Sequence, residues 1–235
     1  MASSAPLVPP ERRGSAVLVV ALAAAVVAGL GFWLHDRWST GVDHSITHFF
    51  AVHLAGRQTA VFLLGFSDPT LAVGVCAVVA GTAALGRRWN VVLLAVSGPL
   101  VAVGLTEFVL KPLVHRPLGG GTYEGVHYPV ADAFPSGHET GLCALTALLA
   151  VLVIRTRWPT AAKALLVALL TAWTLLGAIG LIRNYYHYPT DTIGALGVAV
   201  GTVVAAALVI DRLIERRRPL SGRDVPDRPR TAPGA

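Results

Sequence analysis

Three short polar segments interrupt an otherwise apolar chain, and each holds residues suited to chemistry on a phosphate group. The first runs from Lys111 to Pro117, the second from Pro135 to His138, and the third from Arg183 to Asp191. They are far apart in sequence, so a common site exists only if the fold brings them together.

The third segment pairs a histidine with a carboxylate. His187 and Asp191 are four residues apart at the expected start of a helix. A carboxylate one turn away can hold one imidazole nitrogen and leave the other free as a nucleophile. The plainer alternative is that Asp191 caps the helix and His187 is an interfacial residue. Arg183 adds a cation to the same segment.

The second segment, Pro135-Ser136-Gly137-His138, is typical of a helix start. Free backbone amides at such an end bind anions, above all phosphate. Ser136 adds a hydroxyl donor, and Gly137 lets a phosphate approach closely. His138 would then be placed to protonate a departing oxygen. An ordinary helix cap with a surface histidine would give the same pattern.

The first segment supplies two cations, Lys111 and Arg116. The planar fork of arginine suits a tetrahedral oxyanion, whereas a lone lysine is more often a snorkelling anchor. Glu107 lies four residues before Lys111, so an ion pair within one helix could position the lysine. Taken together, the three segments suit phosphoryl transfer, in which positioning and charge neutralisation supply most of the catalysis.

The elements that must position these residues are membrane helices. Of the 235 residues, 54% are hydrophobic and only 14% are charged, against about 25% charged in soluble domains. We therefore expect an all-α, polytopic bundle with six transmembrane spans of roughly 17–25 residues. The expected spans are Ser15–Leu34, Pro69–Leu85, Val91–Leu110, Gly137–Ile154, Ala164–Ile182 and Thr192–Ile210.

One segment is amphipathic and too polar to span. Gly41 to Phe66 mixes charged and histidine side chains with apolar ones at helical spacing. This pattern predicts an interfacial helix after the first span. Its role is either packing over the bundle or guiding a lipid toward the site.

The basic residues predict the orientation. With a cytoplasmic N-terminus, 14 of the 19 Lys and Arg residues fall on the cytoplasmic side, as the positive-inside rule requires. Both termini are then cytoplasmic, the protein is a multi-pass plasma-membrane protein, and all three polar segments face the extracytoplasmic side. The net charge of +6 is thus a topology signal, and no nucleic-acid partner is expected.

The chain divides into a membrane domain and two tails. We expect a disordered cytoplasmic tail over 1–14, the six-span domain over 15–212, and a basic, Pro-rich disordered tail over 213–235. The loop from Leu118 to Phe134 is expected to border the entrance, with Gly119-Gly120-Gly121 giving it freedom to admit head groups. Cys76 and Cys143 lie in apolar stretches and are interpreted as small buried hydrophobes.

These motifs resemble those of the type 2 phosphatidic acid phosphatase family, which is related to vanadium-dependent haloperoxidases. The family pattern is Lys-x6-Arg-Pro, then Pro-Ser-Gly-His, then Ser-Arg-x5-His-x3-Asp. The resemblance covers about residues 15–212, and the matches at 135–138 and at His187-x3-Asp191 are complete.

Both arginines depart from that pattern. The family spacing places the first arginine at Leu118, but Arg116 comes two residues early. It places the second at Leu181, but Arg183 comes two residues late, and the serine of the third motif has no counterpart. A differently shaped phosphate site is therefore expected.

The resemblance implies a role for each matched residue. His187 would attack phosphorus to form a phosphohistidine, Asp191 would orient it, and His138 would protonate the leaving group and then activate water. The phosphate oxygens would be held by Lys111, Arg116, Ser136, Gly137 and Arg183. The family works without a metal or other cofactor, so none is expected here.

The implied function is an extracytoplasmic lipid phosphatase. Its partner is a lipid phosphate: undecaprenyl diphosphate, phosphatidylglycerol phosphate or phosphatidic acid. The displaced arginines leave a second hypothesis open, a catalytically inactive protein that binds or transports lipid phosphates. A haloperoxidase is the third, disfavoured because those enzymes are soluble. The sequence does not predict an oligomeric state.

Overall fold

The computed structural model describes residues 5–118, 122–123, 126–127 and 130–217. Six long helices form the body of the protein: α1 (Arg13–Leu34), α4 (Pro69–Leu85), α5 (Trp89–Leu105), α7 (Gly137–Ile154), α8 (Thr160–Arg183) and α9 (Pro189–Arg216). The shorter helical elements are η1 (Pro10–Arg12), α2 (Gly41–His53), α3 (Arg57–Leu64), η2 (Gly65–Ser67), the π-helical turn η3 (Thr106–Leu110) and α6 (Lys111–Val114). Four two-residue strands follow α6: β1 (Pro117–Leu118), β2 (Thr122–Tyr123), β3 (Val126–His127) and β4 (Ala131–Asp132).

The described part of the chain contains six helical segments long and apolar enough to cross a membrane. Large apolar side chains point outward from them, among them Phe32, Leu85 and Phe108 at 90%, 88% and 83% exposure. A soluble protein rarely exposes such a continuous apolar surface. The expected all-α bundle with six transmembrane spans is confirmed.

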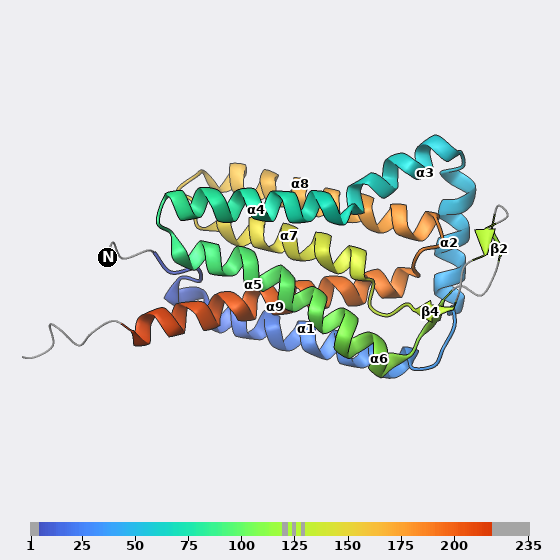
Figure 1. The fold of residues 1–235 in the computed structure, drawn as a ribbon, viewed down its shortest axis with the longest axis horizontal. Helices are drawn as coiled ribbons and strands as arrows, with labels where there is room; N and C mark the ends of the chain where they lie inside the picture. Colours follow the sequence, from blue (N-terminus) through green and yellow to red (C-terminus); the bar gives the residue numbers. More distant parts are fainter. Residues whose placement is uncertain (1–4, 119–121, 124–125, 128–129, 218–235) are drawn as a thin grey trace, which may run out of the picture.

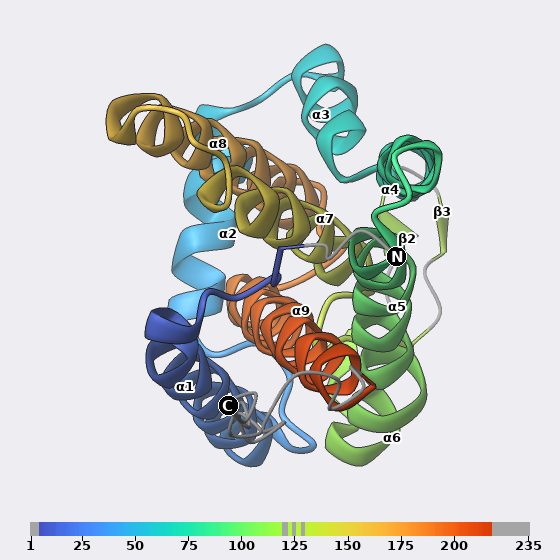
Figure 2. The same ribbon diagram turned by 90° about the vertical axis from the view of Figure 1, so that its left-hand side faces the viewer.

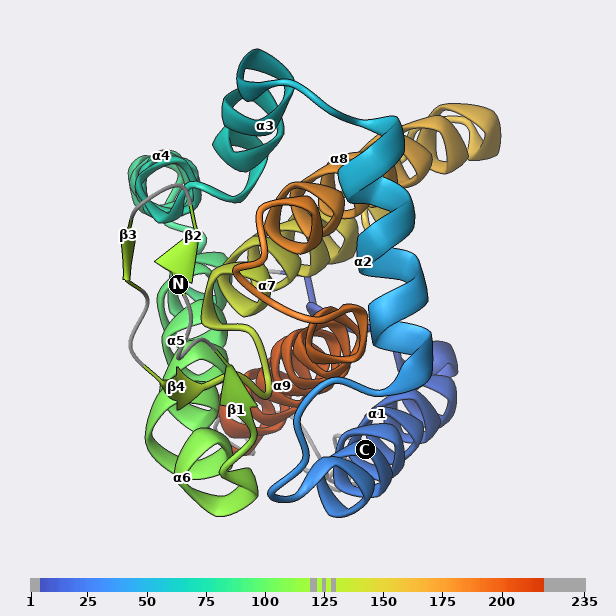
Figure 3. The same cartoon turned by 90° about the vertical axis from the view of Figure 1, so that its right-hand side faces the viewer.

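The long helices run side by side, and α2 crosses one end of the bundle almost at right angles to them (Figure 1). The start of α1 and the end of α9 lie at the opposite end. Figures 2 and 3 view the bundle from its two ends and show α9 surrounded by its neighbours. Helix α9 packs against α1, α5 and α7, so its first turn lies at the centre of the end that α2 covers.

Small residues let α9 approach α1 closely. Gly197 and Gly201 are one turn apart on α9, in a Gly-x-x-x-Gly arrangement. A Cβ added at Gly197 would lie 2.8 Å from Val27 Cγ2, and one added at Gly201 would lie 3.2 Å from Ala23 Cβ. Close backbone approach of this kind is a main source of helix association in membranes.

The amphipathic segment differs in detail from the expected single helix. It breaks at Gly56, whose φ of 108° is readily adopted only by glycine. Helix α2 lies across the bundle end, as expected of an interfacial helix, whereas α3 turns back and leads through η2 into α4. The segment therefore makes a corner over the bundle end.

The N-terminal segment also differs from the expected tail. Leu7 is only 1% exposed. The backbone amides of Leu7 and Val8 donate to the two carboxylate oxygens of Asp211 at 2.8 and 2.7 Å. These bonds tie residues 5–14 to the end of α9. Helix α9 in turn continues to Arg216, past the expected boundary at 212, and residues 218–235 lie outside the described part.

The packing of α9 on α1 predicts a position-specific effect on stability. Gly197→Ile should lower the unfolding temperature in detergent by roughly 5 °C, because overpacking costs about 1–3 kcal/mol. The matched control is Gly29→Ile on α1, where an added Cβ meets nothing within 4 Å. Equal unfolding temperatures for the two variants would contradict this account of the α1–α9 contact.

Candidate active site

The second polar segment forms the start of α7 at the end of the bundle covered by α2. Ser136 is the N-cap residue, and its hydroxyl oxygen accepts the Glu139 amide at 3.3 Å. Its own amide donates to the Asp191 carbonyl at 3.3 Å. The start of α7 is therefore bonded directly to the first turn of α9. Ser136 is fully buried, Gly137 is partly buried and His138 is exposed.

The third segment places a buried histidine beside a buried carboxylate. His187 lies in the turn between α8 and α9 and is 8% exposed, and Asp191 is 0% exposed. The His187 Nδ1 atom lies 3.6 Å from Asp191 Oδ2, longer than a hydrogen bond. The same oxygen accepts the Tyr188 amide at 2.9 Å. Asp191 thus caps α9 and also faces His187, and its role in orienting that imidazole stays a prediction.

Charged groups of all three segments meet at His138. Its imidazole lies within electrostatic range of His187, Lys111, Glu107 and Asp68. The Lys111 ammonium donates to both carboxylate oxygens of Glu107 at 2.8 Å, which confirms the expected ion pair. A Cβ added at Gly137 would collide with Glu107 Oε1 and lie 3.7 Å from Lys111 Nζ. Glycine at this position therefore allows the ion pair to lie against the first turn of α7.

Arg116 has a different environment from the one expected of a phosphate ligand. Helix α6 ends at Val114, the next residue His115 has a left-handed conformation with φ of 48°, and Pro117 prevents continuation of the helix. The chain turns back, so Arg116 points into the protein and is 0% exposed. Its guanidinium lies between Asp191 on α9 and Asp43 on α2. Asp43 belongs to the amphipathic segment, and no motif in the sequence marks it as a site residue.

Asp43 is ionised in this cluster. Burial alone would raise the pKa of its carboxyl group. Hydrogen bonds from Thr40, Thr190 and Arg116 outweigh burial and hold that pKa below its usual range. The sequence carries no clear signal for this role, because the burial of Asp43 and Thr47 on one face of α2 becomes visible only in the structure.

Arg183 is bonded to the connection between α2 and α3. Its Nε–H donates to the Leu54 carbonyl at 3.0 Å, which ties the end of α8 to the connection between α2 and α3. Of the loop expected to border the entrance, Gly119–Gly121 and Glu124 lie outside the described residues. Its ends are paired, with Pro117 opposite Asp132 and Leu118 opposite Ala131 in β1 and β4.

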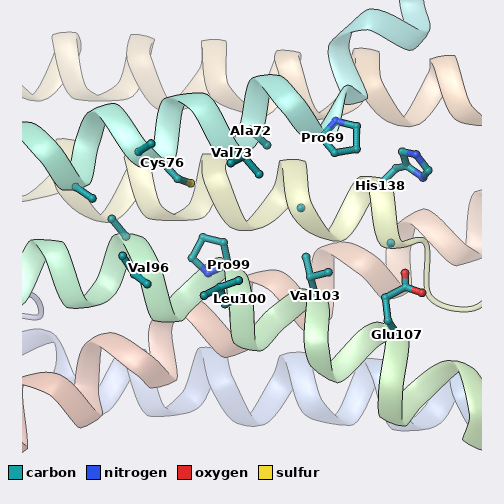
Figure 4. Close-up of a pocket in the computed structure, with 15 residues that line it drawn as sticks. Pro69, Ala72, Val73, Cys76, Val96, Pro99, Leu100, Val103, Glu107 and His138 are labelled. Atoms are coloured by element: carbon teal, nitrogen blue, oxygen red, sulfur yellow. The ribbon is translucent and has the colours of Figure 1, made fainter.

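An apolar groove of about 550 Å³ runs from His138 along α4, α5 and α7. Figure 4 shows His138 and Glu107 at one end of this groove and Cys76 and Val96 toward the other. Apart from that polar end, it is lined mainly by small and aliphatic side chains of membrane helices. Val73 and Leu100 in its walls are 68% and 67% exposed, so the groove opens on the lipid-facing surface. No pattern in the sequence indicates this groove.

A second cavity, of about 260 Å³, reaches His138 from another side. It lies between η2, the start of α4 and the α8–α9 turn, and Asp68 and Tyr186 are among its lining residues. His138 therefore separates an apolar groove from a smaller, more polar cavity. Among the described residues, His, Cys, Asp and Glu side chains form no group of three that could hold a metal ion.

Comparison with known proteins gives the family and the fold. A family model described as the PAP2 superfamily matches residues 67–215. The fold is similar to the crystal structure of the first transmembrane PAP2 type phosphatidylglycerolphosphate phosphatase from Bacillus subtilis, with a TM-score of 0.62 and 14% identity over 87% of this chain and 98% of that one. No curated protein sequence matches the chain. Because the family match contains all three polar segments and covers more than half of the sequence, the chain belongs to the PAP2 superfamily.

Proposed function

We propose that the protein is an integral membrane phosphatase that hydrolyses a lipid phosphate through a phosphohistidine intermediate. The observation that carries the proposal is the position of His138, at the polar end of an apolar groove that opens toward lipid. His187 and Lys111 lie within electrostatic range of it. A lipid whose chain occupies the groove would present its phosphate to these groups.

The geometry supports a two-step reaction. Nδ1 of His187 faces Asp191, so Nε2 is the nitrogen available for attack on phosphorus. The phosphorus–oxygen bond to the lipid breaks as the phosphorus–nitrogen bond forms. His138 gives its proton to the departing oxygen. It then takes a proton from water, which attacks the phosphohistidine and releases inorganic phosphate and free His187. No step requires a metal ion.

We assign the binding of the phosphate oxygens to the start of α7 and to the cations near it. The free amides of the first turn of α7 and its dipole favour an anion there. Lys111 lies beside Gly137, and the phosphate would replace Glu107 as its partner. Ser136 contributes by capping α7, and the sequence motif adds Arg183, in the last turn of α8, to this set.

The distribution of charge supports an extracytoplasmic site. Arg87 and Arg88 lie between α4 and α5, Arg155 directly follows α7, and Arg212 is near the end of α9. These helix ends lie at the end of the bundle opposite α2 (Figure 1). That end is the cytoplasmic one by the positive-inside rule. Both described ends of the chain lie there, and the proposed site faces the other side of the plasma membrane.

The proposed substrates are undecaprenyl diphosphate, phosphatidylglycerol phosphate and phosphatidic acid. The structurally similar Bacillus subtilis protein is described as a phosphatidylglycerolphosphate phosphatase, which makes that lipid a natural member of the panel. All three join an apolar chain to a phosphate, as the groove and the site at its end require.

A second function is supported by one specific observation. Two cations expected to hold phosphate are engaged by protein carboxylates, Lys111 by Glu107 and Arg116 by Asp43 and Asp191. With these cations held by carboxylates, the site would lack the charge that stabilises the transferring phosphoryl group, and a lipid phosphate held by the amides of α7 would not be hydrolysed. The protein would then be an inactive lipid-phosphate binding or transport protein.

Hydrolysis distinguishes the two functions. The purified protein should release phosphate from at least one lipid of the panel with EDTA present. His187→Ala should lower that rate on the order of 10⁴-fold, because the nucleophile is lost. His48→Ala, which removes an exposed histidine of α2, is the control and should match the wild type. A wild type that releases no phosphate from any lipid would favour the binding protein.

The groove predicts a dependence on chain length. Gly141 lines it, and an added Cβ there meets only Val103 Cγ2 at 3.9 Å, so Gly141→Leu should fold and fill part of the groove. We expect its KM for long-chain lipid phosphates to rise about tenfold, with little change for p-nitrophenyl phosphate.

The control for that variant is Gly104→Leu on α5. Gly104 is not among the groove residues, and an added Cβ there has no neighbour within 4 Å. Its KM should remain that of the wild type with both substrates. Equal losses with long-chain and chain-free substrates in Gly141→Leu would show that the groove does not hold the lipid chain.

A further inference from the structure

Arg116, Asp43 and Asp191 form a fully buried ion cluster next to the proposed nucleophile, His187. Arg116 Nη2 donates to Asp43 Oδ2 at 2.6 Å, and its Nη1 donates to Asp191 Oδ1 at 2.5 Å. All three side chains are 0% exposed. The cluster joins three elements that are distant in sequence: α2, the turn after α6, and the first turn of α9.

Thr190 completes the cluster. Its hydroxyl accepts Arg116 Nη1–H at 2.6 Å and donates to Asp43 Oδ1 at 2.9 Å. Its backbone amide donates to the same Asp43 oxygen at 3.1 Å. The first turn of α9 is thus bonded to Asp43 on α2 and to Arg116 in the turn after α6.

The contacts around Arg116 also make its guanidinium inaccessible to a substrate. The Tyr188 ring covers the guanidinium, with Cζ 4.4 Å from the ring centroid. Arg116 Nη2 also donates to the Trp38 carbonyl at 3.3 Å. Only Nε lacks a partner among the described residues, and it is buried too. A phosphate would have to displace a carboxylate or the tyrosine ring to reach this cation.

Both oxygens of Asp191 are fixed as a result. Oδ1 accepts Arg116, and Oδ2 accepts the Tyr188 amide while facing His187 Nδ1. A small displacement of a reacting group lowers the reaction rate by a large factor. Because both oxygens of Asp191 are held, this carboxylate can keep the His187 ring in one orientation. The cluster therefore affects the orientation of the His187 imidazole.

We infer that Arg116 and Asp43 are positioning residues of the reaction, which fix Asp191 and through it His187, and that Arg116 does not bind the phosphate. This inference rests on the proposed function. It also gives α2 a role beyond covering the bundle end, because Asp43 connects this interfacial helix to the nucleophile.

The test separates orientation from binding. Arg116→Gln and Asp43→Asn should each lower kcat, by about 100-fold for Arg116→Gln. Their KM and their inhibition constant for inorganic phosphate should stay within about twofold of the wild type. Lys111→Gln, at a proposed phosphate contact, is the comparison and should weaken phosphate inhibition about tenfold.

A double variant separates orientation from folding. Arg116→Gln alone leaves two buried carboxylates without a cation, which is expected to destabilise the protein. Adding Asp43→Asn restores the net charge of the wild-type cluster, so the double variant should unfold at a higher temperature than Arg116→Gln. Its kcat should nevertheless stay low, because Asp191 still lacks its partner.

Two results would overturn the inference while the wild type is active. A double variant that recovers both stability and kcat would show that the cluster only supports the fold. An Arg116→Gln protein that loses phosphate inhibition as Lys111→Gln does, with Asp43→Asn unaffected, would show that Arg116 is a phosphate ligand. A wild type inactive on every lipid phosphate would instead overturn the proposed function, and the positioning role with it.

Discussion

A carboxylate removed completely from water needs a compensating charge, and the arrangement of this protein at one end of the bundle follows from that need at Asp191. Its partner is Arg116, which also pairs with a second buried carboxylate, Asp43. Removing Arg116 would leave two buried carboxylates without a cation. The cluster thereby fixes the first turn of α9, the turn after α6 and the interfacial helix α2 relative to one another.

The groups proposed to react are arranged around this fixed turn. The amide of Ser136 bonds to the Asp191 carbonyl, so the start of α7 is registered against α9 and His138 is brought near His187. From His138 the apolar groove leads away between membrane helices. Charged side chains and an apolar groove thus meet at one side chain, as a reaction on an amphipathic substrate requires.

Much of this was predictable from sequence where a single physical pattern decides the structure. Long apolar stretches predicted the six spans, and four-residue spacing predicted the pair of Lys111 with Glu107. The side-chain position of Arg116 was not predictable, because it depends on the left-handed turn at His115 and on Asp43, 73 residues away. The groove was not predictable either, since its walls come from three helices and look like any other apolar surface.

The central claim is that His187 carries the phosphoryl group. The most direct measurement is to mix the protein with a lipid substrate labelled in its phosphate, quench within one turnover, and locate the label. We predict a covalent phosphoenzyme that is stable in alkali, labile in acid and attached to His187. It should be absent from His187→Ala and more abundant in His138→Ala, where water is no longer activated. Lipid hydrolysis by the wild type without any labelled histidine, or with the label on another residue, would contradict the account.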